Sequence, residues 1–228
     1  NSPLIWVIGD LNDQESLGVA MKGCARVFHT AAIVSFHPND EEAIIANNAE
    51  GTANVVNAML HTGVTDLVHV SSVSALGHIE GEIITEETPF EEGRGVTAYA
   101  RSKYRAELEV WRGQEEGLNV AVVNPTIIIG PGDFTRSSGE IFSQIHSGIP
   151  FYPKGSNGYV SSSDVAKACI LLADNSVRGE RFLLNSENLR YRDLLTSVAN
   201  SLNVKAPAKP IKPWMAGVVW RAFWLLEK

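Results

Sequence analysis

Short apolar runs alternate with amphipathic stretches along most of this 228-residue chain. The runs with the length of a β-strand are 4–10, 25–32, 66–72, 118–125 and 180–185. Helical spacing of apolar residues is found at 13–23, 40–63, 97–113, 161–175 and 190–203. A strand that is apolar along its length must be covered on both faces, which is typical of parallel sheets. The alternation therefore predicts an α/β fold, a parallel sheet with helices on both faces.

The alternation becomes less regular after the stretch "GPGD", which ends at residue 133. Residues 134–158 carry Gly, Pro and Ser between apolar residues, a composition typical of loops and short elements. We therefore expect residues 1–133 and 159–175 to form the sheet. A smaller mixed lobe is expected from residues 134–158 and 176–228.

Composition argues against several classes of protein. The formal net charge is −7 at pH 7, so a broad basic surface for nucleic acid is not expected. The apolar stretch 214–226 is short and contains Arg221, which favours a packed amphipathic helix over a membrane-surface helix. Cys24 and Cys169 lie in apolar helical contexts without metal-ligand spacing. We expect two buried thiols, no metal site and a reducing, cytoplasmic location.

The stretch "TAYARSKYRAE" places Tyr99 and Lys103 four residues apart in a predicted helix. Positions i and i+4 lie on one helix face, about 6 Å apart. An ammonium near a phenol stabilises the phenolate and lowers the phenol pKa from its ordinary value of about 10. Such a phenol can serve hydride transfer to a carbonyl, because the developing alkoxide needs a proton. The spacing alone is more typical of a solvated helix face than of a catalytic pair, because Y-x-x-x-K often occurs by chance.

A hydroxyl near the same substrate oxygen would complete such a site. Ser71 and Ser72 end the predicted strand 66–72, at the edge where parallel α/β sheets bind ligands. Adjacent strand residues point to opposite sides, so only one of the two serines can face a cleft. The order of serine pair, Tyr–Lys helix and a strand ending in "NPTIIIGPGD" favours an enzyme over chance spacing.

Several stretches, in this order and spacing, resemble the extended short-chain dehydrogenase/reductases of the NAD-dependent epimerase/dehydratase superfamily. They are "GDLND", "VFHTAAIVSF", "NNAEGTANVVNA", "VHVSSVSALG", "YARSK", "NPTIIIGPGD" and "YVSSSDVAKA". The dihydroflavonol-reductase-like and 3β-hydroxysteroid-dehydrogenase-like branches look most similar. The resemblance implies a Rossmann-type, doubly wound parallel sheet that binds NAD or NADP, and a C-terminal lobe that binds the substrate.

The resemblance also implies roles for individual residues. Ser72 matches the catalytic serine, Tyr99 the general acid/base, and Lys103 the residue that assists the phenol and holds the nicotinamide ribose. Asn48 matches a buried helical asparagine that supports the site. Positions matching cofactor contacts are Asp10 and Leu11 at adenine, Thr30, Ala31 and Ala32 along the ribose and pyrophosphate, and Pro125, Thr126, Ile127 and Ile128 at the nicotinamide amide. His29, on a strand, is expected to be a packed structural histidine.

Two parts of the family pattern differ in this sequence. Residues 1–228 contain no G-x-G-x-x-G, so the strand, glycine-rich loop and helix that hold the pyrophosphate in this family are not in the chain as given. We therefore expect the chain to be part of a longer protein, and it does not specify NAD or NADP. Ser161 and Ser163 occupy positions where the family often has Asp and Arg.

The residues near the serine and in the lobe bear on the type of reaction. The stretch 73–76 after Ser72 contains no carboxylate, which argues against the dehydratases of this superfamily. The lobe is rich in apolar and aromatic residues, most of them expected to be core: Phe134, Ile141, Phe142, Phe151, Tyr152 and Trp214. Its cations are few (Arg136 and Lys154), so we expect a small lipophilic ketone or alcohol as substrate. The alternatives are a nucleotide-sugar epimerase and a non-catalytic NAD(P)-sensing protein.

The resemblance further implies a homodimer in which two long helices of each subunit pack as a four-helix bundle. The candidates are the helices at about 40–61 and 97–113. Ala58 and Leu108 are expected on their outer faces.

Overall fold

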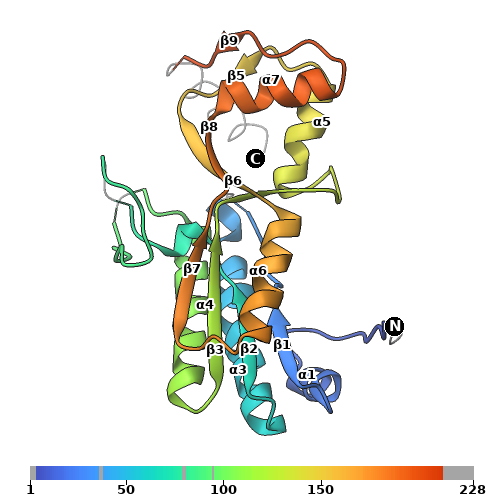
Figure 1. Cartoon of the computed structure of the whole chain (residues 1–228), viewed down its shortest axis with the longest axis vertical. Coiled ribbons are helices and arrows are strands. Elements are labelled where there is room, and N and C mark those ends of the chain that lie inside the picture. Colours follow the sequence, from blue (N-terminus) through green and yellow to red (C-terminus); the bar gives the residue numbers. More distant parts are fainter. Residues whose placement is uncertain (1–3, 36–37, 79–80, 94, 213–228) are drawn as a thin grey trace. The chain divides into compact units, whose positions relative to one another are not determined.

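The computed structural model describes residues 4–35, 38–78, 81–93 and 95–212 (Figure 1). These residues form two compact units. The sheet unit comprises the described residues within 1–126 and 163–184, and the lobe comprises those within 127–162 and 185–228. Each unit is described by itself.

The sheet unit is built on a four-stranded parallel sheet. Its strands are β1 (Arg26–His29), β2 (Asp66–Val70), β3 (Asn119–Pro125) and β7 (Glu180–Leu184), in the order β1-β2-β3-β7. All but the first residue of β3 are buried, because this central strand is covered on both faces. The predicted α/β class with a parallel sheet is confirmed.

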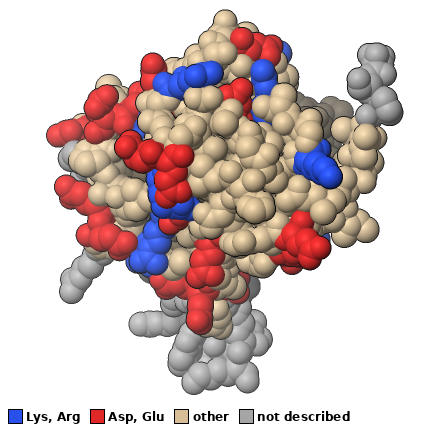
Figure 2. Space-filling view, turned by 90° about the horizontal axis from the view of Figure 1, so that it is seen from below, with Lys and Arg blue, Asp and Glu red and all other residues tan. Residues whose placement is uncertain are grey.

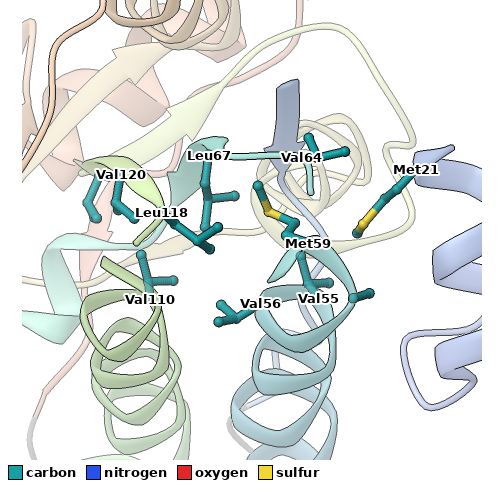
Figure 3. Packing of buried hydrophobic residues seen from close by; sticks show 11 residues of the cluster. Met21, Val55, Val56, Met59, Val64, Leu67, Val110, Leu118 and Val120 are labelled. Atoms are coloured by element: carbon teal, nitrogen blue, oxygen red, sulfur yellow. The ribbon is translucent and has the colours of Figure 1, made fainter. Parts of the chain in front are cut away.

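Helices α3 (Gly51–Thr62) and α4 (Ala98–Glu115) pack against each other and cover one face of the sheet (Figure 3). The apolar side chains of this core include Val55, Val56 and Met59 of α3, Val110 of α4, Leu67 of β2, and Val120 and Val122 of β3. Val120 and Val122 are two residues apart on β3, and Leu67 of β2 is in register with Val120. The three side chains therefore share one face of the sheet. The other α-helices in the described part of the unit are α1 (Gln14–Met21), α2 (Glu41–Ile45) and α6 (Ser162–Asp174), whose first residue belongs to the lobe.

The described residues of the lobe form two small sheets and two α-helices, with a 3-10 turn at Ser137–Gly139. Strands β4 (Ile127–Ile129), β6 (Ser156–Ser161) and β8 (Glu187–Arg190) form one sheet, and β5 (Phe151–Tyr152) pairs with β9 (Lys209–Pro210). Helices α5 (Glu140–His146) and α7 (Tyr191–Ser201) pack together around a core centred on Ile145, Leu194, Leu195 and Val198. Ile141, Phe142 and Tyr152 pack against this core, as expected for most of the apolar residues there.

The boundary between the units differs from the predicted one. Residues 176–184 belong to the sheet unit, because β7 pairs with β3 in parallel register. Residues 127–133 and 159–162 belong to the lobe, because β4 pairs with β6. These pairings join segments that are distant in sequence. The local sequence pattern of 176–184 therefore does not indicate which strand it pairs with.

Other predictions are wrong for identifiable reasons. The apolar run 4–10 is not a strand, and its side chains from Leu4 to Ile8 are exposed because no strand of the described chain pairs with it. Cys24 is exposed just after α1, whereas Cys169 is buried as expected. Ala58 faces the core against the sheet, and only Leu108 of the two residues chosen for an outer face is exposed. The stretch 214–226 and Trp214 lie outside the described residues.

Candidate active site

The two serines that follow the carboxyl end of β2 make hydrogen bonds to different partners. The Ser71 hydroxyl donates to Glu107 Oε2 at 2.7 Å, on the side of α4. Ser72 is the N-cap of a short 3-10 helix (Val73–Ala75), and its Oγ accepts from the Ser74 N–H at 3.1 Å. That bond occupies a lone pair of Ser72 Oγ and leaves the hydroxyl proton available for another acceptor.

Tyr99 lies in the first turn of α4 and is hydrogen-bonded through its side chain to Ser72. Thr97 caps this helix, since its Oγ1 accepts from the Ala100 N–H at 3.1 Å. Burial raises the pKa of Tyr99 above its ordinary value, and the hydrogen bond with Ser72 opposes this rise. A hydroxyl that donates to the phenol oxygen has this effect, because it stabilises the phenolate.

Lys103 lies one turn further along α4 and is only 2% exposed. Its Nζ donates to the carbonyl oxygen of Val70 at 2.9 Å, two residues before Ser72. Burial lowers the pKa of Lys103 to about 8, while the carboxylate of Glu107 acts in the opposite direction. The expectation that Lys103 brings the pKa of Tyr99 below its ordinary value is wrong in this structure, because burial of the phenol dominates.

Asn48 sits in a π-helical turn (Ala46–Glu50) between α2 and α3 and is buried. Its Oδ1 accepts from the Ile33 N–H at 2.7 Å, and its Nδ2 donates to the Ile33 carbonyl at 2.9 Å. Nδ2 also donates to Ser102 Oγ at 2.9 Å, on α4. Asn48 therefore ties the segment after β1 to the helix that carries Tyr99 and Lys103.

Two buried histidines lie side by side on β1 and β2. His29 and His69 are in register, with ring centroids 5.1 Å apart. Thr52 Oγ1 donates to the Asn48 carbonyl and so accepts from His29 Nε2 at 2.9 Å. Burial lowers the pKa of His29 to about 4, with a smaller contribution from the charge of Lys103. The structure confirms that His29 is a packed structural histidine.

The positions expected to contact the cofactor are divided between the two units. Thr30, Ala31 and Ala32 follow β1 at the carboxyl edge of the sheet and are exposed. Leu11 packs against Gly51 of α3, and the neighbouring Asp10 is exposed. Pro125 ends β3 and Thr126 follows it in the sheet unit, whereas Ile127 and Ile128 are in β4 of the lobe. Among residues 4–35, 38–78, 81–93 and 95–212, no three His, Cys, Asp or Glu side chains gather as metal ligands do.

The sequence interpretation missed a buried carboxylate, Glu107. It is 2% exposed and lies one turn after Lys103 on α4. Its position four residues beyond Lys103 is a signal that the sequence contained, because a charged residue there falls on the same buried helix face. Asn124 was missed as well, and its Nδ2 donates both to Glu107 Oε2 at 2.9 Å and to the Ser72 carbonyl at 3.0 Å.

Gly77, five residues after Ser72, permits a close approach of two loops. A Cβ on Gly77 would lie 1.7 Å from the carbonyl oxygen of Pro89, a backbone atom. We predict that Gly77→Ala lowers the free energy of unfolding by about 2–3 kcal/mol, because one loop must move. Urea unfolding followed by circular dichroism measures this loss. Gly93→Ala is the control, since a Cβ there meets nothing within 4 Å, and equal effects of the two changes would contradict the explanation.

A family model described as the NAD dependent epimerase/dehydratase family matches residues 1–184. The chain belongs to this family. A Synechocystis sp. protein named, provisionally, a dihydroflavonol 4-reductase is 31% identical over 222 residues, which cover 94% of this chain and 64% of the relative. The sterol demethylase protein B of Methylococcus capsulatus is 32% identical over 211 residues, covering 90% of this chain and 63% of the relative. The chain thus spans less than two thirds of the length of these two relatives.

Solved structures of this epimerase/dehydratase fold agree with the described architecture. The crystal structure of gox2253 has a TM-score of 0.81 and 33% sequence identity, covering 97% of this chain and 68% of that chain. The UDP-glucose 4-epimerase of Thermus thermophilus, in complex with NAD, has a TM-score of 0.73. It is 23% identical and covers 90% of this chain and 72% of that chain, which shows the fold alone. The resemblance drawn from the sequence motifs is confirmed.

Proposed function

We propose that the protein is an NAD(P)-dependent oxidoreductase that reduces a carbonyl, or oxidises the corresponding alcohol, of a small lipophilic substrate. The observation that supports it is the hydrogen bond between Ser72 and Tyr99, at the carboxyl end of β2, with Lys103 one helical turn beyond. Family membership is consistent with this chemistry. The names of the two relatives, a dihydroflavonol 4-reductase and a sterol demethylase protein, favour a lipophilic substrate.

Each residue would have a defined task. The raised pKa of Tyr99 keeps its proton on the phenol at neutral pH, so Tyr99 can give that proton to the carbonyl oxygen as charge develops there. Ser72 would orient the same oxygen through its hydroxyl and stabilise the phenolate that remains. Asn48 would keep the segment after β1 and helix α4 in place through its bonds to Ile33 and Ser102.

The residues present fit the nicotinamide end of such a cofactor, which supplies or accepts the hydride when bound. The bond of Lys103 to Val70 uses one of the three N–H donors of its ammonium, and a ribose hydroxyl is a suitable acceptor for another. Thr30, Ala31 and Ala32 lie exposed at the carboxyl edge of β1, where a cofactor would run in an α/β sheet. We propose that these residues and Lys103 bind the cofactor.

On the face seen in Figure 2, acidic side chains are scattered among uncharged ones, with basic side chains between them. Within the described residues, no helix combines the length and the apolar character needed to cross a membrane. A homodimer through the outer faces of α3 and α4 stays a prediction, for which the exposed Leu108 is one candidate contact.

Oxidation of NADH and NADPH by the full-length protein, measured over a panel of lipophilic ketones, tests the proposal. We predict that Ser72→Ala lowers kcat/KM about 100-fold, because one hydrogen bond to the developing charge is lost. Ser74→Ala is the control, since only the backbone N–H of Ser74 contacts Ser72. Conversion of nucleotide sugars without net cofactor oxidation would support the epimerase instead. Cofactor binding without turnover of either class would support the sensing protein.

A further inference from the structure

Glu107 is on the buried face of α4. Its partners lie at the end of β2, on β3, on β7 and on α4 itself. On the sheet side, Oε2 accepts from the Ser71 hydroxyl at 2.7 Å and from Asn124 Nδ2 at 2.9 Å. On the other side, Oε1 accepts from Trp111 Nε1 at 3.3 Å and lies 3.2 Å from an Arg181 guanidinium nitrogen. Three hydrogen bonds and one ion pair therefore fix the position of both carboxylate oxygens.

Two routes lead from Glu107 to the proposed catalytic residues. Ser71, which donates to it, precedes Ser72 directly, and Asn124 bonds to both Glu107 and the Ser72 carbonyl. Lys103 lies four residues before Glu107 on α4, on the same buried face about 6 Å away. The carboxylate therefore fixes the position of the β2 end and also faces a cation that has been removed from water.

The buried ammonium of Lys103 needs such a counter-charge. Burial of an amine favours its neutral form, whereas a nearby carboxylate favours the ammonium. The rings of His29 on β1 and His69 on β2 interact with Lys103 and are themselves kept uncharged by burial. Glu107 is the carboxylate whose charge acts on Lys103, and Arg181 of β7 pairs with Glu107 from the side of Trp111.

We propose that Glu107 is a positioning residue that keeps the Lys103 ammonium charged and holds the Ser72 end of β2 in place. This inference rests on the proposed function for its catalytic meaning, but its physical content is the charge state of Lys103. Neither side chain needs substrate for that interaction. The network is tied to Arg181 of β7, so the sheet edge and the site share one hydrogen-bonded unit.

The test is the titration of Lys103 Nζ by NMR in full-length protein with isotope-labelled lysine. The signal is assigned by its disappearance in Lys103→Met. In the unaltered protein we expect a midpoint of about 8, because burial lowers the pKa of Lys103. We predict that Glu107→Gln lowers this midpoint by about one pH unit, because the counter-charge is lost while the side-chain size is kept.

The control is Glu109→Gln, on the same helix, where the carboxylate pairs with Arg112 at the surface. It should leave the Lys103 midpoint unchanged, and so should Ser71→Ala, which removes a hydrogen bond but no charge. A residue with a purely structural role would lower stability in Glu107→Gln without moving the midpoint. An unchanged midpoint in Glu107→Gln therefore overturns the proposal.

A second measurement does not depend on the folding of Glu107→Gln. In the otherwise unaltered protein with labelled glutamate, the Glu107 carboxylate signal should show a step at the Lys103 midpoint, and Lys103→Met should lack that step. Absence of the step also overturns the proposal. Both readouts are independent of turnover, so loss of the proposed oxidoreductase activity and loss of the Glu107 role are distinguishable results.

Discussion

Replacing Tyr99 by Phe is expected to lower kcat/KM for carbonyl reduction about 1000-fold in the full-length protein. The change removes one hydroxyl, and with it the proton that would go to the substrate oxygen and the partner of Ser72. The ring stays, so the packing around the first turn of α4 is kept. Cofactor affinity should change little, because Lys103 and the segment 30–32 are untouched.

The matched control for this change is Tyr104→Phe. Tyr104 is on the same helix, and its ring stacks on Phe90 with centroids 4.2 Å apart. Loss of its hydroxyl should leave turnover within about twofold, because surface substitutions away from a site have small effects. Steady-state kinetics with the best ketone of the panel checks both variants. Undiminished turnover in Tyr99→Phe would refute the assignment of Tyr99 as the acid.

Asn48→Ala is expected to lower the free energy of unfolding by about 2–3 kcal/mol. The side chain makes three hydrogen bonds, two with the Ile33 backbone and one with Ser102 Oγ. Ser102 Oγ gives its own proton to the Tyr99 carbonyl at 2.8 Å, so the loss reaches the first turns of α4. Alanine leaves these partly buried groups without their partner and leaves a small cavity in the π-helical turn.

Chemical unfolding measures this effect, with Asn57→Ala as the control. Asn57 lies on α3, and its exposed side chain accepts one hydrogen bond, from Arg112. We expect a loss of at most about 0.5 kcal/mol there, because water replaces an exposed partner. If both variants lost the same stability, the bonds of Asn48 would not be the cause. Amide exchange at Ile33 should also increase in Asn48→Ala alone.

The local pattern was sufficient to predict the strands that became β1, β2, β3 and β7 and the helix of Tyr99 and Lys103. Each of these strands is a short apolar run. In β3 every residue except the first is buried, and in β2 the three middle residues are buried. The run 4–10 has the same pattern but is exposed, since a strand needs a partner as well as a pattern. The prediction that residues 176–184 belong to the lobe was wrong for the same reason, because the pairing of β7 with β3 is a long-range contact.

The candidate site shows the same division. Residue order suggested Tyr99, Lys103 and one of the two serines Ser71 and Ser72. The resemblance to the family then selected Ser72. The sequence did not contain the burial of Tyr99, which raises the pKa of its phenol where a lower value was expected. Nor did it show that Lys103 reaches the Val70 carbonyl, or that Ser71 turns to Glu107.

By itself, the sequence determined the α/β class, the family and the three residues that carry the proposed chemistry. Periodicity and spacing act over a few residues, so they can be read without coordinates. The tertiary structure decided which strands pair, which serine meets the phenol, and that Lys103 and Glu107 are both buried on α4. Those outcomes depend on distances between segments far apart in the chain and on how much water is excluded between them, and both exist only in the folded protein.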